Sequence, residues 1–172
     1  AQAENRDKVS DLLDLNRAKV FRRGLMVHKL LEVLPRYPQE EQQERAARYL
    51  DAVADEETAG DKQSMAAMAL EVMATFPDLF GPQSRAEVDL MGQDAQGRSQ
   101  NLRVDRLAVT DDAVLVVDFK TNTKVPQTPP AAYKRQLEVY AEVARRLWPH
   151  RQVKTALLWT AASPPRLDWV QA

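Results

Sequence analysis

The chain has 172 residues, which fits one domain able to bury roughly 70% of the surface that its unfolded form exposes. It contains no cysteine, so disulfides, iron–sulfur clusters and thiolate zinc sites are excluded, and a reducing, cytoplasmic location is expected. The net charge of −1 argues against a protein that simply coats nucleic acid. No apolar run reaches the length of a membrane span and no signal-peptide pattern is present, so we expect no membrane contact.

The first half of the chain predicts helices. Residues 1–20 are polar with a weak apolar rhythm and could be a helix detached from some preceding domain. We interpret them as a connecting segment that precedes a single domain over 21–172. Helices are predicted over 21–34, where a proline ends the apolar repeat, and over 40–54 and 62–74. The methionines of the third helix recur at helical spacing and indicate core packing rather than a cofactor contact.

After Gly81-Pro82 the apolar pattern changes to that of strands. Three strands joined by short polar turns predict a meander over 84–92, 100–109 and 113–119. A proline-rich connection then leads to a helix over 131–148, a strand over 153–160 and a short last strand over 167–170. This order of elements is typical of an α/β fold with a mixed central sheet flanked by helices.

The third predicted strand ends in the pattern Asp118-Phe119-Lys120. Side chains alternate across a strand, so Asp118 and Lys120 project from one face. Asp105 lies 13 residues upstream, and an antiparallel hairpin would place its carboxylate beside that of Asp118. Two carboxylates and a lysine at the edge of a sheet suit a hard cation and the hydrolysis of a phosphodiester. The alternative is that these acids only form turns at strand ends.

Positive charge is concentrated in the last third of the chain. Residues 120–154 carry eight lysines and arginines against two glutamates. A basic segment beside a metal site would follow a phosphate backbone, and we expect Lys124, Lys134 and Arg135 to contact the substrate strand. The alternative is an ordinary solvated helix face.

Four segments, taken together, resemble a known family. They are Gly24-Leu25-Met26-Val27-His28-Lys29-Leu30-Leu31-Glu32, Val104-Asp105-Arg106-Leu107, Val117-Asp118-Phe119-Lys120-Thr121-Asn122 and Gln136-Leu137-Glu138-Val139-Tyr140. In this combination the chain resembles the RecB-type branch of the PD-(D/E)XK nucleases. The resemblance is strongest to the C-terminal nuclease domain of AddA helicase–nuclease subunits, which act in bacterial double-strand-break repair.

The resemblance implies a restriction-endonuclease-like fold and a divalent-metal site. Mg²⁺, for which Mn²⁺ would substitute, would be bound by His28, Asp105, Asp118 and the carbonyl of Phe119. Lys120 would hold or polarise the attacking water and stabilise charge on the phosphate. Asp105, Asp118 and Lys120 are therefore the expected catalytic residues.

The resemblance also implies that Gln136 and Tyr140, one helical turn apart, face the site, with Tyr140 touching the DNA or packing beneath the metal ligands. Without the resemblance, His28 would be interpreted as a surface or hydrogen-bonded polar residue of a helix. Gly24, one turn earlier, would let the helix approach another backbone closely, which supports a ligand role for His28. Glu87 is left open as a further metal ligand or a supporting acid.

Two further residues bear on the resemblance. Leu102 stands where the family commonly has a glycine, so the backbone near Asp105 is expected to differ in detail. His150, at a predicted helix end, is interpreted as a cap or surface residue. The chain has no phosphate-loop motif, so it contains no ATP motor.

The expected function is that of a magnesium-dependent DNA exonuclease domain. The resemblance implies that single-stranded DNA ends are delivered to it by the helicase portion of the same polypeptide, with an AddB-like subunit as partner. Two alternatives stay open. One is a catalytically silent DNA-binding or scaffold domain of the same fold, and the other is an α/β interaction module without a metal site.

Overall fold

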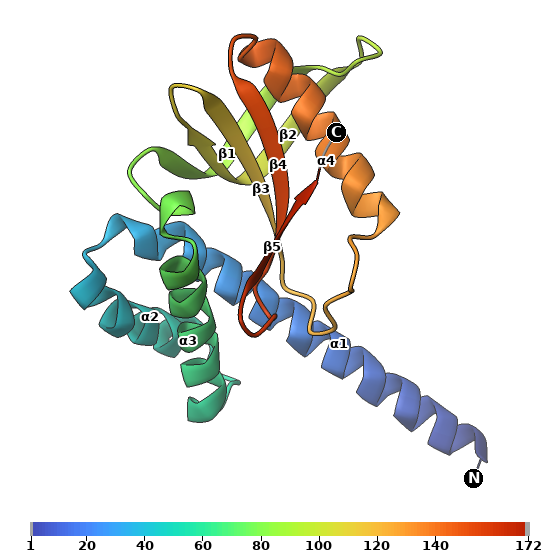
Figure 1. Ribbon diagram of the computed structural model, residues 1–172. Coiled ribbons are helices and arrows are strands. Elements are labelled where there is room, and N and C mark those ends of the chain that lie inside the picture. Colours follow the sequence, from blue (N-terminus) through green and yellow to red (C-terminus); the bar gives the residue numbers. More distant parts are fainter. Residues whose placement is uncertain (1, 171–172) are drawn as a thin grey trace.

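The computed structural model describes residues 2–170, and it describes side chains from residue 12 onward. A five-stranded mixed sheet lies between helices (Figure 1). The elements in chain order are α1 (Gln2–Val33), a 3₁₀ turn (Leu34–Arg36), α2 (Gln39–Val53), α3 (Ala59–Thr75), a second 3₁₀ turn (Pro77–Leu79), β1 (Ser84–Gln93), β2 (Ser99–Val109), β3 (Ala113–Lys120), α4 (Ala131–Leu147), β4 (Gln152–Trp159) and β5 (Arg166–Val170).

The strands lie in the sheet in sequence order, β1-β2-β3-β4-β5. The pairs β1–β2 and β2–β3 are antiparallel, which confirms the predicted meander. α4 then carries the chain across so that β4 pairs parallel to β3, and β5 returns antiparallel to β4. The predicted mixed sheet flanked by helices is confirmed.

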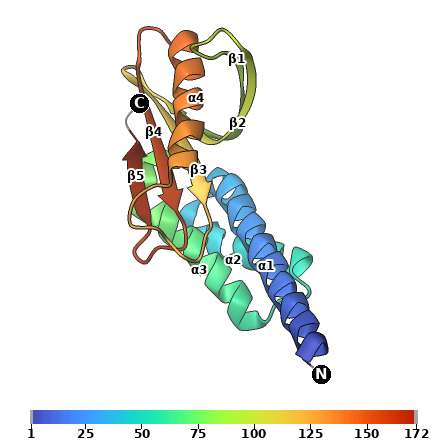
Figure 2. The same cartoon turned by 90° about the vertical axis from the view of Figure 1, so that its right-hand side faces the viewer.

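The two faces of the sheet pack against different helices (Figures 1 and 2). Val117 and Phe119 of β3 share a core with α1, α2 and α3. Val114 and Val116 of the same strand pack with α4 in a second core. Because β3 is covered on both faces, its sequence is an almost continuous apolar run rather than an alternating one.

α1 unites two predicted segments. The connecting segment over 1–20, which could be a helix, and the helix predicted over 21–34 form one continuous helix, Gln2–Val33. No glycine or proline interrupts the first 23 residues, so nothing in that stretch breaks the helix. The division into 1–20 and 21–172 remains a prediction. Within the described residues, no helix is both long and apolar enough to cross a membrane.

α3 begins earlier than expected, at Ala59 rather than near Lys62. Thr58 caps this helix, since its side-chain oxygen accepts a hydrogen bond from the Asp61 N–H at 3.1 Å. The cap satisfies a backbone donor that the first helical turn leaves unpaired.

The β1–β2 hairpin curves around α4 (Figure 2). Val104 and Leu107, three residues apart on β2, both belong to the α4 core, so the simple alternation of side chains is interrupted between them. Opposite this point on β1, Glu87 has φ +52°, a conformation that non-glycine residues rarely adopt. Gly92 then lies close to α4, because a Cβ there would be 3.0 Å from Val143.

Candidate active site

The site lies where β2 and β3 separate. Their ladder ends with Arg106 opposite Val117, so Asp105 and Asp118 stand just beyond the last pair. The N–H of Phe119 donates to Oδ2 of Asp105 at 2.6 Å instead of to a backbone carbonyl of β2. The Asp105 carboxylate thus lies between the diverging strands β2 and β3, at a position that we call the fork. Its second oxygen, Oδ1, faces α1.

Three side chains meet at this fork from three elements. Nε2 of His28, on α1, lies 3.0 Å from Oδ1 of Asp105, on β2, and Nδ1 of His28 lies 3.4 Å from Oε1 of Glu87, on β1. One donor atom from each of these residues lies within 4.8 Å of the others. The His28 ring also contacts Phe119 edge-on, with 5.2 Å between ring centroids.

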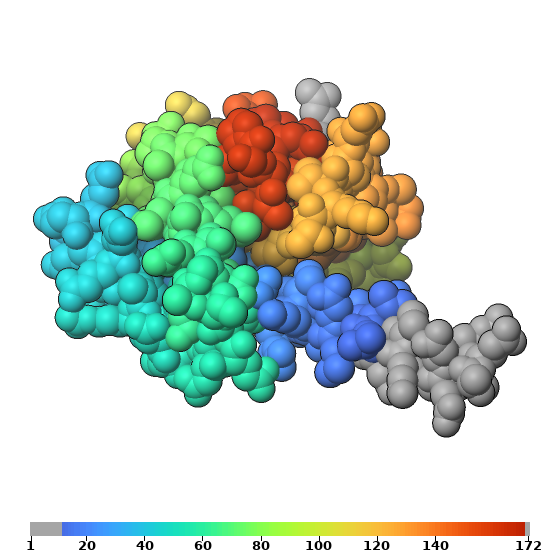
Figure 3. Space-filling view, turned by 90° about the horizontal axis from the view of Figure 1, so that it is seen from below, coloured from blue at the N-terminus to red at the C-terminus, as the bar shows by residue number. Residues whose placement is uncertain are grey.

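Gly24 allows α1 to lie this close to the end of β3. A Cβ at Gly24 would be 3.2 Å from the Cβ of Thr121, the residue after β3. Figure 3 shows the segment that follows β3 lying beside α1. The expected close approach is therefore present, against the Thr121 side chain, and His28 follows one turn later on the same helix.

Asp118 and Lys120 form a second group beside the first. Lys120 Nζ lies 2.7 Å from Asp118 Oδ2, with side chains 16% and 9% exposed. The ammonium also lies 3.5 Å from Oε1 of Gln136 and 3.9 Å from the centroid of the Tyr133 ring. Oδ2 of Asp118 is buried, and in the part of the chain described it accepts no hydrogen bond of regular geometry.

α4 forms the floor of the site. Nε2 of Gln136 donates to the hydroxyl of Tyr140 at 3.2 Å, and that hydroxyl donates to the carbonyl of Arg103 at 3.2 Å. Tyr140 is buried, so it packs beneath the carboxylates and joins α4 to β2. Gln136 is the residue of this pair that reaches Lys120.

Two carboxyl groups of the site, Asp118 and Glu87, have a raised pKa. Burial raises the pKa of Asp118, and the Asp105 carboxylate raises it further, to about 6 despite the opposing charge of Lys120. Burial likewise raises the pKa of Glu87, reinforced by Asp105. Burial lowers the pKa of His28, but the hydrogen bond and charge of Asp105 outweigh it, so the net shift is upward. The cluster therefore concentrates negative charge, which favours a bound cation.

The predicted DNA-contacting cations lie at the surface near this floor. Lys134 and Arg135 are exposed on the first turns of α4, and Lys124 is exposed in the preceding loop. No ion pair within the described residues involves any of the three. His150 is exposed in the turn after α4, away from the fork.

Comparison with known proteins identifies the fold. A family model described as the PD-(D/E)XK nuclease superfamily matches residues 3–168. The chain belongs to this superfamily. No curated protein matches it significantly. Among solved structures, one titled "Crystal structure of SSO0001" is similar, with a TM-score of 0.41 and 17% identity, over 84% of this chain and 66% of that chain.

The donor set of this PD-(D/E)XK chain fits a divalent metal ion. The imidazole of His28 and the carboxylates of Glu87 and Asp105 converge, whereas Oδ2 of Asp118 is ion-paired with Lys120. Mg²⁺ and Mn²⁺ prefer oxygen ligands and accept an imidazole. His28, Glu87 and Asp105 would hold the ion. Ligand roles for Asp118 and the Phe119 carbonyl stay predictions.

The structure adds residues to the set taken from the sequence. Glu87, whose role the sequence left open, lies with His28 and Asp105 in the cluster. The residue pattern did not predict its positive φ. Arg106 was not singled out, although a charged residue within an apolar strand is a usable signal. Burial, with the nearby charges of Arg36 and Arg85, lowers the pKa of Arg106 to about 10, so it remains protonated at neutral pH.

Leu102 is accommodated without disturbing the fork. It pairs with Leu90 in the β1–β2 ladder, and its side chain packs with the α4 core. The hairpin at this point is already curved over α4, which gives a large apolar side chain a surface to cover. A difference of the backbone near Asp105 from that of the family stays a prediction.

Proposed function

We propose that this chain is a magnesium-dependent deoxyribonuclease domain that hydrolyses phosphodiesters of single DNA strands. The observation that carries the proposal is the convergence of His28, Glu87 and Asp105 donors within 4.8 Å, beside the Asp118–Lys120 ion pair. Membership of the PD-(D/E)XK nuclease superfamily supports a phosphodiester as the bond that is cleaved. A silent scaffold would have no chemical need for both groups.

A divalent ion at this cluster would supply Lewis-acid stabilisation of the charge that develops on the phosphate. Lys120 is placed to orient the attacking water and to neutralise part of that charge, because its ammonium is held by Asp118, Gln136 and the Tyr133 ring. Its three contacts fix the ammonium before substrate arrives. Asp118 thus has two tasks, since its carboxylate faces both Lys120 and the metal donors.

The substrate part of the proposal is supported by charge. Three cations are exposed around the start of α4, and all three come before Gln136 in the chain: Lys124, Lys134 and Arg135. Phosphate contacts of this kind do not depend on base sequence, which suits an exonuclease that degrades any strand.

The cellular context of the proposal is supported by the resemblance of the four quoted segments to AddA-type subunits. We infer that the domain works in the cytoplasm in double-strand-break repair. In that setting a helicase portion of the same polypeptide delivers single-stranded ends, and an AddB-like subunit is its partner. The superfamily match supports the nuclease core of this proposal but does not distinguish the branch.

Incubation of the purified chain with end-labelled single-stranded DNA tests the activity. With Mg²⁺ or Mn²⁺ we expect progressive shortening of the strand, and with EDTA no cleavage. Asp118→Ala should abolish cleavage while the protein remains folded by circular dichroism. DNA binding without cleavage under all metal conditions would instead identify a silent DNA-binding domain.

A further inference from the structure

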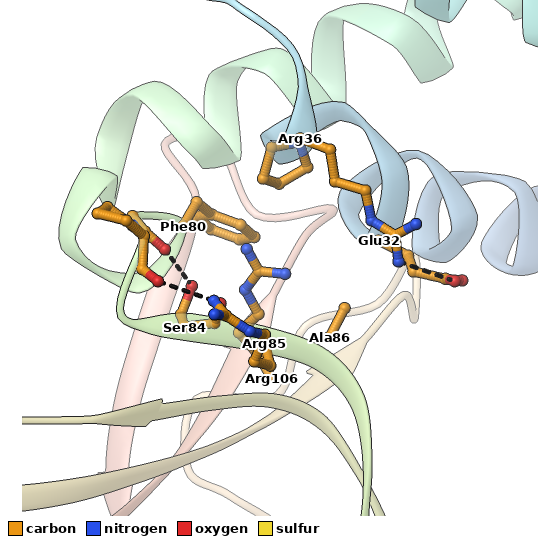
Figure 4. A pocket seen from close by; sticks show the side chains of 10 residues that line it. Glu32, Arg36, Phe80, Ser84, Arg85, Ala86 and Arg106 are labelled. Carbon is orange, nitrogen blue, oxygen red and sulfur yellow. Dashed lines mark hydrogen bonds and ion pairs between the residues drawn. The ribbon is translucent and has the colours of Figure 1, made fainter.

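A pocket lies next to the metal cluster, at the C-terminal end of α1. It has a volume of about 500 Å³ and lies between the end of α1, the start of β1 and β2 (Figure 4). Three arginines line it: Arg36, Arg85 and Arg106. They come from three separate parts of the chain, so only the tertiary structure brings them together.

Arg106 is held at the bottom of this pocket. It is 4% exposed, its Nε donates to the carbonyl of Leu79 at 3.0 Å, and its guanidinium carbon lies 4.9 Å from the centroid of the Phe80 ring. No carboxylate pairs with it among the described residues, and its terminal nitrogens point between Phe80 and Arg36 (Figure 4). A buried cation without a counter-charge is costly unless an anion completes the site.

The other two arginines add positive charge that one shared carboxylate only partly balances. Nη1 of Arg85 donates to the carbonyls of Pro82 and Ser84 at 2.7 and 2.9 Å, which orients the guanidinium without cancelling its charge. The one acid that lines the pocket, Glu32, lies 4.0 Å from Arg36 and bonds Lys29 at 2.8 Å. Three guanidinium groups therefore share a single, already paired carboxylate.

The pocket continues the metal site along three elements. Arg106 directly follows Asp105 on β2, and Ala86, which lines the pocket, directly precedes Glu87 on β1. Glu32 lies one helical turn after His28 on α1. The Phe80 ring, which lines the pocket, lies 6.1 Å from the Phe119 ring, and Phe119 lies 5.2 Å from the His28 ring, so the pocket is close to the cluster.

We propose that this arginine pocket binds a phosphate of the substrate strand next to the phosphate that is cleaved. Guanidinium groups bind phosphate oxygens through paired, charge-assisted hydrogen bonds, and the two non-bridging oxygens of a phosphodiester offer acceptors for them. This inference rests on the proposed function for the identity of the substrate. It assigns the strand a path that passes the metal cluster and the end of α1.

Binding of a fluorescein-labelled oligothymidylate in EDTA tests the pocket apart from metal and cleavage. The double variant Arg36→Gln/Arg85→Gln should bind about tenfold more weakly, since two charge-assisted contacts are lost. The slope of log affinity against log salt should flatten by about 0.7 for each lost contact. Arg48→Gln is the matched control and should bind like the wild type, because Arg48 is an exposed arginine on α2 that forms an ion pair with Glu44.

Two further measurements separate the possible results. Arg36 and Arg85 are exposed, so their variants should keep the wild-type melting temperature, and Mn²⁺ affinity should be unchanged. Arg106→Lys, which keeps the charge but loses the planar guanidinium, should show an intermediate loss of DNA affinity.

Wild-type affinity and salt slope in the double variant would overturn the proposal of a phosphate-binding pocket and leave the nuclease proposal intact. Weakened binding together with a wild type that never cleaves DNA would overturn the nuclease proposal and leave an anion pocket.

Discussion

Nε2 of His28 lies 3.0 Å from Oδ1 of Asp105, although the two residues are 77 positions apart in the chain. α1 and β2 meet here because Gly24 lets the helix lie against Thr121 at the end of β3. The contact joins the helical and sheet parts of the fold at the point where the donors converge. A metal ion bound there would bridge both parts.

The first prediction concerns that bridge. His28→Ala should weaken Mn²⁺ binding by about tenfold or more, because one of the converging donors is removed. The loss should also reduce the rise in melting temperature that saturating Mn²⁺ produces. Isothermal titration calorimetry and thermal melting give the two quantities. His150→Ala is the control, and an equal effect of both substitutions would remove His28 from the site.

The second prediction concerns pH. Burial and the Asp105 carboxylate raise the pKa of Asp118 to about 6, above its ordinary value near 4. A raised carboxyl pKa favours folding while the group is protonated, so this contribution is present below pH 4 and is lost as pH rises through 6. In EDTA, the free energy of unfolding should fall by on the order of 2 kcal/mol over this range.

Asp118→Asn provides the control for that titration, because an amide stays neutral at every pH. Urea unfolding in EDTA should show the variant more stable than the wild type at pH 7.5 and nearly equal to it at pH 4. The same variant should lose Mn²⁺ affinity. A wild-type profile that is flat between pH 4 and 7.5 would contradict the buried, coupled position of this carboxylate.

The third prediction assigns Lys120 to the reaction rather than to metal binding. Lys120→Ala should lower the cleavage rate by about a hundredfold, as expected for loss of a preorganised charge at the phosphate. Its effect on Mn²⁺ affinity should be small or favourable, since a repelling cation is removed. Lys124→Ala, in the exposed loop, should lose far less activity. Single-turnover cleavage rates measured at saturating metal distinguish the two lysines.

The fourth prediction uses the unusual backbone of Glu87. Its φ of +52° costs on the order of 1 kcal/mol for a non-glycine residue. Glu87→Gly should therefore raise the stability of the metal-free protein while it weakens Mn²⁺ binding. Glu87→Gln removes the charge but keeps the strain, so the glycine variant should be the more stable of the two. If glutamine and glycine give equal stability, the backbone carries no strain at this position.

The fifth prediction concerns the exposed cations of α4. Reversing two of them in Lys134→Glu/Arg135→Glu should reduce single-strand affinity and flatten its salt dependence, because phosphate contacts that release counterions are lost. Neither side chain is paired within the described residues, so the fold should melt at the wild-type temperature. Fluorescence anisotropy over a range of salt concentrations measures the slope. An unchanged slope would show that this face of α4 only meets solvent.

Local rules account for the parts of the site that were predicted. Asp118 and Lys120 share a face because strand side chains alternate, and this needs only the residue order. Asp105 comes beside Asp118 because a short hairpin sets their register, as the pairing of Arg106 with Val117 confirms. The bounds of the strands were also predicted from local sequence, because turn residues mark where each strand ends.

The continuity of α1 was beyond what periodicity could predict. The apolar residues Leu12, Leu13 and Leu15 are exposed, so their weak rhythm marks no core face and did not join residues 1–20 to the helix predicted from Phe21. The helix continues through this segment, which no glycine or proline interrupts. Hydrophobic periodicity reports burial, and it reports helix length only when the two coincide.

By itself, the sequence determined the α/β order of elements, the Asp118–Lys120 face and the Asp105 hairpin, because each depends on residues close in the chain. His28 entered the site only through the resemblance, and its contact with Asp105 required α1 to pack against the end of β3. The tertiary structure alone placed Glu87 in the cluster, through a backbone conformation set by the curvature of the hairpin. It alone gathered Arg36, Arg85 and Arg106 around one pocket, because packing between distant segments decides which charges lie together and that Arg106 is buried.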